Sequence, residues 1–296
     1  LSVNFDLFKE TRRDIFLSRA NTIPNFIGLN GADVYGNLGK MENKGIDLAL
    51  DYNKQVNKDL FISFKGTFTF AHNTILEKDE PDFQKYPNLS QVGYSYGQRL
   101  LLLSDGLFMV EASIKNHPTQ NLGFSPMPGD IRYVNMPDYA GNYDDIIDEN
   151  DRIWMGYPED PEIVYGFGPS IKWKKWDFSF FFQGTARSSL LIGDIHPFGT
   201  ARYKNLFKYI ADDHWSLDNP NPNAKYPRLT QMENKNNTYG SSYWLRNSAF
   251  LKLKNAEVGY TYKMCRFYVS GVNLLTFSSF DLWDPELGSG NGLKYP

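Results

Sequence analysis

Apolar and polar residues alternate with a period of two in several segments of this chain, and no other feature constrains its fold as strongly. Over residues 60–70, the even positions carry Leu, Ile, Phe, Gly, Phe and Phe, whereas the odd positions are mostly polar. Such alternation is typical of a β-strand with one apolar face and one polar face. The same reasoning predicts strands at residues 1–9, 44–54, 59–70, 163–173, 176–186, 246–262 and 266–277.

The apolar positions change parity within the predicted strand 246–262. Leu251 and Leu253 occupy odd positions, but from Ala256 onward the apolar residues occupy even positions. One extra residue inserted in the strand would return both halves to a single face. The sequence therefore predicts a β-bulge near Lys254 and Asn255.

Short turns and long connections alternate along the chain. Outer-membrane β-barrels have this layout, with short turns at the periplasm and long loops outside the cell. A soluble β-sandwich more often has turns at regular short intervals, and a large sandwich with elaborate loops is the alternative. The pattern favours an all-β segment of a large antiparallel transmembrane β-barrel with long extracellular loops. The predicted turns lie at residues 55–58, 174–175 and 263–265, and the predicted long connections at 10–43, 71–162 and 187–245.

Composition agrees with this interpretation and removes other classes. The 296 residues contain no run of 18 apolar residues, which excludes a helical membrane span. A barrel strand buries only every second residue in lipid, so a barrel needs no such run. With 41% hydrophobic residues the chain is not intrinsically disordered, and its net charge of −3 gives no support for nucleic-acid binding.

The number of predicted strands is odd. If residues 55–58 lie in the periplasm, both the first and the last predicted strand run outward. Bacterial single-chain barrels have an even number of strands and end at the periplasm. We therefore expect at least one further inward strand after Pro296, so that this chain is one segment of a larger barrel.

Several motifs resemble those of one transporter family, in the order in which that family has them. They match the SusC/RagA-type TonB-dependent outer-membrane transporters and resemble the C-terminal portion of the barrel. The motifs are residues 39–45 (GKMENKG), 128–133 (PGDIRY), 147–152 (IDENDR), 181–184 (FFQG), 224–228 (AKYPR), 250–255 (FLKLKN), 268–274 (YVSGVNL) and 284–286 (DPE).

The resemblance implies both an architecture and a function. It implies a 22-stranded barrel with an N-terminal plug. Residues 1–296 would be the C-terminal part of this barrel and would contain neither the plug nor the final strand. The implied function is nutrient uptake, the TonB-dependent import of oligosaccharides or oligopeptides across the outer membrane of a Gram-negative bacterium. The implied partners are a SusD-like surface lipoprotein, TonB acting through the absent plug, and outer-membrane lipid.

An acidic segment is a candidate calcium site. Carboxylate and amide oxygens at close spacing suit Ca²⁺. The family usually has a calcium-loop pattern here, but this chain lacks the glycine that permits the sharp turn of such a loop. The alternative is a solvated acidic surface loop, and no other cofactor is expected. The candidate ligands are Asp138, Asn142, Asp144, Asp148 and Asp151.

Aromatic residues in the long connections are candidate ligand contacts. Such rings stack on sugars and pack against peptide side chains. The alternative is that they pack within the loops or lie in the aromatic belts that flank a membrane barrel. The candidates are Trp154, Tyr157, Trp215, Tyr239, Tyr243 and Trp244.

No catalytic residues are predicted, and the chain is not expected to be an enzyme. The histidines lack zinc-ligand spacing, and Cys265 has no recognisable catalytic partners. The alternative function is that of a soluble carbohydrate-binding β-domain. Four phenylalanines distinguish the two, because in a barrel they point outward into an apolar band, whereas in a soluble domain they pack between two sheets. They are Phe64, Phe68, Phe178 and Phe180.

Overall fold

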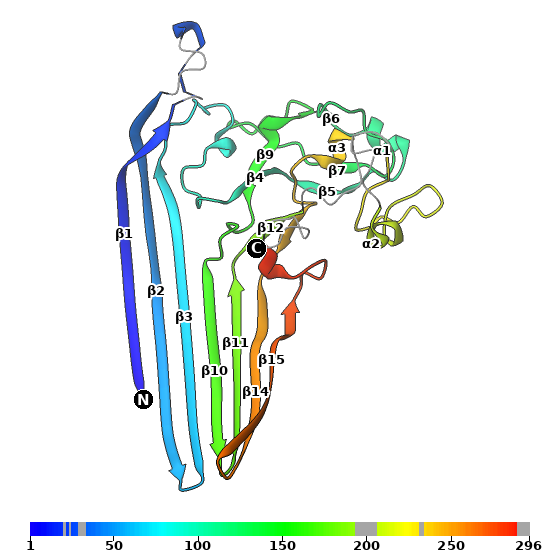
Figure 1. Cartoon of the computed structure of the whole chain (residues 1–296). Helices are drawn as coiled ribbons and strands as arrows, with labels where there is room; N and C mark the ends of the chain where they lie inside the picture. Colours follow the sequence, from blue (N-terminus) through cyan, green and yellow to red (C-terminus); the bar gives the residue numbers. More distant parts are fainter. Residues whose placement is uncertain (20–21, 24, 29–33, 193–205, 231–233, 289–296) are drawn as a thin grey trace.

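The computed structural model describes residues 1–19, 22–23, 25–28, 34–192, 206–230 and 234–288. Seven long strands form one antiparallel sheet in the order β1-β2-β3-β10-β11-β14-β15 (Figure 1). The seven strands predicted from alternation, and their hairpin pairing, are confirmed. Their bounds are β1 (Ser2–Ser18), β2 (Tyr35–Asn57), β3 (Leu60–Glu77), β10 (Ile163–Trp173), β11 (Trp176–Ala186), β14 (Phe250–Tyr262) and β15 (Cys265–Ser278).

The first three strands are longer than predicted, β3 by residues 71–77. The stretch 10–43, expected as a connection, is mostly β-structure, because β1 and β2 stay paired as far as Ser18 and Tyr35. Charged residues replace the apolar stripe there, so the alternation is lost although the backbone pairing continues. Glu42 lies among them and accepts ion pairs at 2.7 Å from both Lys9 and Lys44.

The predicted bulge is confirmed. Phe181 pairs with Asn255 and Phe182 with Leu253, so Lys254 is the extra residue of β14. The pairing of β14 with β15 shifts at the same place. The bulge returns the apolar residues on both sides of it to one face.

The two faces of the sheet differ in polarity across all seven strands. One row of paired residues on the first face runs Phe5, Leu48, Phe68 and Tyr165. The opposite face is polar, and on it Thr69 donates a hydrogen bond of 2.7 Å to Asp47. The apolar face is therefore continuous along the sheet, as an outward face in lipid requires.

The apolar face is not the core of a sandwich. Phe64, Phe68, Phe178 and Phe180 are half-buried, and none belongs to the cluster of buried hydrophobic residues. Within the described ranges, every other sheet has two strands. The predicted fold class, an antiparallel barrel segment with long loops, is thus confirmed over a packed sandwich.

Short elements gather at the end of the sheet opposite the three hairpin turns (Figure 1). We call residues 78–162, 187–192, 206–230, 234–249 and 279–288 the loop layer. No helix in the described part of the chain is long and apolar enough to cross a membrane. The strands of this layer are β4 (Arg99–Leu102), β5 (Ser104–Leu107), β6 (Thr119–Gln120), β7 (Ile131–Tyr133), β8 (Ile146–Ile147), β9 (Arg152–Met155), β12 (Ser189–Leu191) and β13 (Leu245–Asn247). Its helices are η2 (Pro87–Leu89), α1 (Glu111–Lys115), η3 (Glu149–Asp151), α2 (Lys208–Asp212), α3 (Lys235–Thr238) and η4 (Pro285–Leu287), while η1 (Asn25–Ile27) lies between β1 and β2.

Candidate functional site

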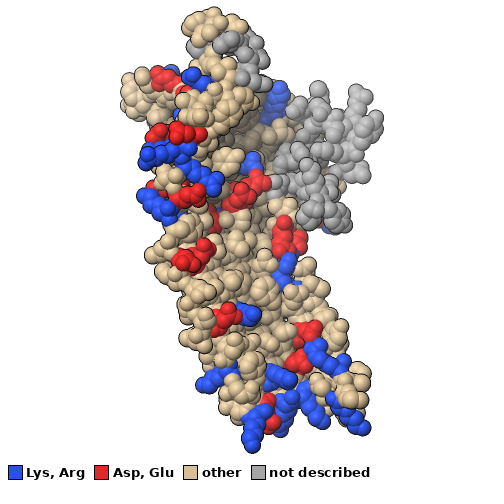
Figure 2. All heavy atoms as spheres, turned by 60° about the vertical axis from the view of Figure 1, so that its left-hand side comes forward, with Lys and Arg blue, Asp and Glu red and all other residues tan. Residues whose placement is uncertain are grey.

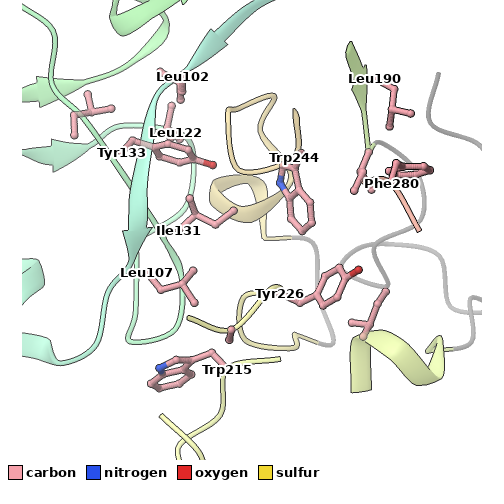
Figure 3. Packing of buried hydrophobic residues seen from close by; sticks show 14 residues of the cluster. Leu102, Leu107, Leu122, Ile131, Tyr133, Leu190, Trp215, Tyr226, Trp244 and Phe280 are labelled. Carbon is pink, nitrogen blue, oxygen red and sulfur yellow. The ribbon is translucent and has the colours of Figure 1, made fainter. Parts of the chain in front are cut away.

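The loop layer has its own hydrophobic core (Figure 3). Trp244 is 1% exposed, and its Nε1 donates a hydrogen bond of 2.8 Å to the carbonyl of Asn237. The rings of Tyr226 and Tyr243 lie 6.4 and 5.1 Å from it, centroid to centroid. Residues from the two long connections 71–162 and 187–245, together with Phe280 after β15, thus form one packed unit. Its other buried members include Leu102, Leu107, Leu122, Ile131, Tyr133, Leu190, Trp215 and Phe280.

A buried carboxylate holds this unit together. Asp130 is fully buried and accepts two hydrogen bonds from the guanidinium of Arg228, at 2.6 and 3.2 Å. The amides of Asn234 and Asn237 each donate to its Oδ1 at 2.9 Å, and the backbone N–H of Met127 donates to Oδ2 at 2.8 Å. Asp130 lies in the PGDIRY motif and Arg228 in the AKYPR motif, so two motifs noted only for their order are ion-paired.

The residue before Asp130 has to be a glycine. Gly129 has φ of 89°, a conformation that other residues rarely adopt. A Cβ on it would lie 2.1 Å from Cε3 of Trp215. The indole of Trp215 therefore packs directly on this turn.

A second buried carboxylate joins the ends of three strands next to the loop layer. The side chain of Glu162 is 3% exposed, and its two oxygens contact Nδ1 of His72 at 2.5 Å and Nε of Arg187 at 2.6 Å. The guanidinium of Arg187 also lies 5.4 Å from the ring of Phe70 and 5.0 Å from that of Tyr157. These contacts fix the ends of β3, β10 and β11 relative to one another.

The segment after β15 folds back onto the polar face of β14. The buried Lys252 forms ion pairs with Asp284 and, at 2.6 Å, with Glu286. Lys254 reaches the same Glu286 at 2.8 Å. The bulge places both lysines within reach of one carboxylate, which gives the DPE motif a structural role that its letters did not reveal.

Two hollows lie on the polar face near the loop layer, on either side of residues 160–161. The first has a volume of about 300 Å³ and the second about 500 Å³. Asp160 lines both of them and is exposed. The first is also lined by Glu10, Asn43, Asn73, Tyr96 and Glu162, and the second by Gln183, Thr185, Ser248, Phe250 and Glu286.

Two of the six predicted ligand-contacting aromatics lie at the base of the loop layer. Trp154 is half-buried, stacks on Tyr94 at 5.9 Å and donates from Nε1 to the carbonyl of Leu89 at 3.3 Å. Tyr157 is 40% exposed, beneath the guanidinium of Arg187.

The other four lie in or against the core of the loop layer. Trp215 and Trp244 are buried members of it, and Tyr239 and Tyr243 pack against it. The hydroxyl of Tyr243 donates to the carbonyl of Ala224, and that of Tyr239 to Glu149, both at 2.9 Å. Burial raises the pKa of Tyr239 to about 12. Ligand contact by these four stays a prediction, since the contacts described are with protein groups.

The acidic segment forms a series of hydrogen-bonded turns. Asp138 Oδ1 accepts from the backbone N–H groups of Ala140 and Asn142, and the bond from Asn142 lowers the pKa of Asp138. Asp148 and Asp151 cap η3 reciprocally, and burial raises the pKa of Asp151.

The remaining acidic residue, Asp144, accepts a hydrogen bond of 3.0 Å from the backbone N–H of Ile146. The described residues contain no group of three or more His, Cys, Asp or Glu side chains placed to hold a metal ion. Calcium binding by this segment stays a prediction.

Comparison with known proteins identifies relatives of one kind. No family model matches the chain. Two proteins of Formosa agariphila, each named TonB-dependent receptor, are 23% and 28% identical to it over 98% and 92% of its length. The chain spans 29% and 28% of their lengths.

Among solved structures, the RagAB peptide transporter superposes with a TM-score of 0.68 over 97% of this chain and 31% of that chain, at 22% identity. The same importer in a closed-closed state gives a TM-score of 0.67 at 21% identity. The similarity to TonB-dependent receptors, the fold of a barrel segment and localisation in the outer membrane of a Gram-negative bacterium, all predicted from the sequence, are confirmed.

Proposed function

From its similarity to TonB-dependent receptors, we propose that this chain forms part of the wall and extracellular mouth of a barrel that imports oligosaccharides or oligopeptides, with energy supplied through TonB. The observation that carries the proposal is the continuous apolar face of the seven-stranded sheet, opposite a polar face that ends beneath the loop layer. The apolar face suits lipid and the polar face suits a water-filled passage.

The chain contributes binding surfaces and makes or breaks no bond. Among the described residues the buried acidic side chains all have partners: Asp130 pairs with Arg228, and Glu162 with His72 and Arg187, while Asp151 accepts from the backbone N–H groups of Met136 and Asp148. Such closed pairs hold loops in place.

The ligand enters through the two hollows at the extracellular end of the polar face. Amide and carboxylate groups of their walls hydrogen-bond either sugar hydroxyls or peptide groups, while the ring of Tyr96, 66% exposed, offers a stacking surface. Of the six aromatics predicted to contact ligand, Tyr157 is the one best placed, because its ring is 40% exposed.

A SusD-like lipoprotein covers the loop layer from outside. This proposal is supported by large apolar side chains exposed on that layer, which suit a protein interface. They include Val110, Met127, Tyr139, Tyr143 and Leu217, which are 49–83% exposed.

Uptake by intact cells tests the function. Cells that carry the intact gene should accumulate fluorescent oligosaccharides or oligopeptides from a mixed library, and accumulation should stop when either this gene or TonB is inactivated. Uptake that persists without TonB contradicts the proposal. Recovery of the protein in the soluble fraction supports the alternative, a soluble carbohydrate-binding domain.

A further inference from the structure

The three hairpin turns form one connected rim. The backbone N–H of Lys174 donates to the carbonyl of Asp59 at 2.7 Å, which joins the β10–β11 turn to the β2–β3 turn. The N–H of Thr261 donates to the carbonyl of Lys175 at 2.8 Å, which joins β14 to the β10–β11 turn. We call residues 54–60, 172–177 and 261–267 the turn rim.

The turn rim is strongly basic. It contains seven Lys or Arg residues and two Asp residues, in a chain whose net charge is −3. Lys and Arg gather at this lower end of the molecule in Figure 2. Its acidic groups leave most of this charge unneutralised, because Arg266 takes up Asp177.

All six lysines of the turn rim have exposed side chains, and none forms an ion pair with a carboxylate among the described residues. Lys172 lies opposite Asp177 in the pairing of β10 with β11, whereas the other five face no acidic residue across a described strand pair. Two of them, Lys174 and Lys263, have φ of 53°, where Gly or Asn fits at lower steric cost. The turn geometry therefore gives no reason for a lysine at these positions. The five are Lys54, Lys58, Lys174, Lys175 and Lys263.

Exposed aromatic side chains accompany these lysines. The ammonium of Lys174 lies 5.7 Å from the ring of Trp173, and that of Lys263 lies 5.5 Å from the ring of Tyr262. Aromatic rings of this kind mark the level of lipid headgroups at a membrane surface. The rings at the turn rim are those of Trp173, Trp176, Tyr262 and Phe267, which are 41–64% exposed.

We propose that the turn rim binds anionic phospholipid headgroups of the periplasmic leaflet. This inference rests on the proposed function for its membrane setting and adds a lipid preference to it. The apolar face continues upward from the aromatic rings, so acyl chains lie against the strands while the lysines meet the headgroups. Unpaired lysines at headgroup level are drawn to anionic lipid, and each adds to the attraction.

Tryptophan fluorescence reports on the turn rim. Of the six tryptophans of the chain, only Trp173 and Trp176 lie in the long strands. The full-length protein is placed in nanodiscs of phosphatidylcholine that contain either brominated phosphatidylglycerol or brominated phosphatidylcholine, and quenching is compared. Quenching should favour the anionic lipid by about tenfold or more in apparent affinity and should weaken with added salt. A variant with both residues changed to Phe identifies their share of the signal.

Two charge variants complete the test. Changing Lys54, Lys58, Lys174, Lys175 and Lys263 to Gln should reduce the preference for anionic lipid to less than about twofold. A matched variant should keep the preference for anionic lipid. In it, five exposed lysines of the loop layer are changed to Gln: Lys85, Lys115, Lys208, Lys225 and Lys235.

Three results would overturn the inference. Equal quenching by both lipids rejects the headgroup preference and leaves the membrane placement intact. A preference that survives loss of the five lysines rejects the turn rim as its cause. Absence of quenching by either lipid rejects the membrane placement itself, and with it the proposed function.

Discussion

The buried ion pair between Asp130 and Arg228 should control the rigidity of the loop layer. In Asp130→Asn, an amide N–H₂ group replaces one of the two carboxylate oxygens. Where it replaces Oδ2, Arg228 and the backbone N–H of Met127 meet this donor group instead of an acceptor. The guanidinium is left without its counter-charge. Removing one partner of a buried ion pair costs about 3–5 kcal/mol.

The expected loss of stability lies near the lower end of this range. The Arg228 side chain is 18% exposed, so water partly solvates the guanidinium that has lost its counter-charge. A cost of about 3 kcal/mol raises the fraction of locally open molecules by on the order of 10². Hydrogen–deuterium exchange of the purified full-length protein, read by mass spectrometry, should show this increase in peptides covering residues 125–135 and 224–230.

Asp105→Asn is the matched control. Asp105 pairs with Arg132 at 2.7 Å, but these side chains are 45% and 33% exposed. An exposed pair contributes no more than about 1 kcal/mol, so exchange should change less than about fivefold. Equal effects of the two variants, or protected amides in Asp130→Asn, would refute the view that the buried pair holds the loop layer.

Three further predictions concern other contacts. Gly129→Ala should destabilise the loop layer by about 2–4 kcal/mol, measured as faster amide exchange around Trp215, and unchanged exchange would contradict the packing described. Lys252→Met should weaken the attachment of residues 279–288 to β14 by about 1–3 kcal/mol. Amide exchange should then be faster in that segment alone. Exchange at the wild-type rate would show that the ion pairs do not hold the segment. Burial raises the pKa of both Tyr226 and Tyr239 to about 12, so the folded state holds these protons more tightly than the unfolded state. Stability should therefore be intact below about pH 10 and fall as pH rises toward 12, with tyrosinate absorbance and amide exchange rising together; ionisation of these residues near pH 10 in a folded protein would contradict this.

The strands could be predicted because alternation is a local property. Each strand within the lipid-facing band shows its pattern over about ten residues, and even the bulge at Lys254 follows from a change of parity. The outer halves of β1 and β2 could not be predicted in this way, because charged residues such as Lys9, Glu42 and Lys44 interrupt the apolar stripe there. Strand pairing alone extends them.

The loop layer depends on contacts between distant residues. Asp130 and Arg228 are 98 residues apart, and no local pattern pairs them, although both lie in motifs that the sequence marks. The aromatics predicted to contact ligand show the same limit. Composition identifies Trp215 and Trp244, but only the fold reveals that both are buried while Tyr157 is partly exposed.

The central claim is that one face of the sheet meets lipid and the other meets water. Spin labels at Phe68→Cys and Thr67→Cys, adjacent positions on opposite faces of β3, test it directly in nanodiscs, with Cys265 changed to Ser in both. The label at position 68 should be more accessible to oxygen, which concentrates in lipid, and the label at position 67 to a water-soluble nickel complex. A label at position 68 that is shielded from both reagents, or that reacts mainly with the nickel complex, would contradict the account.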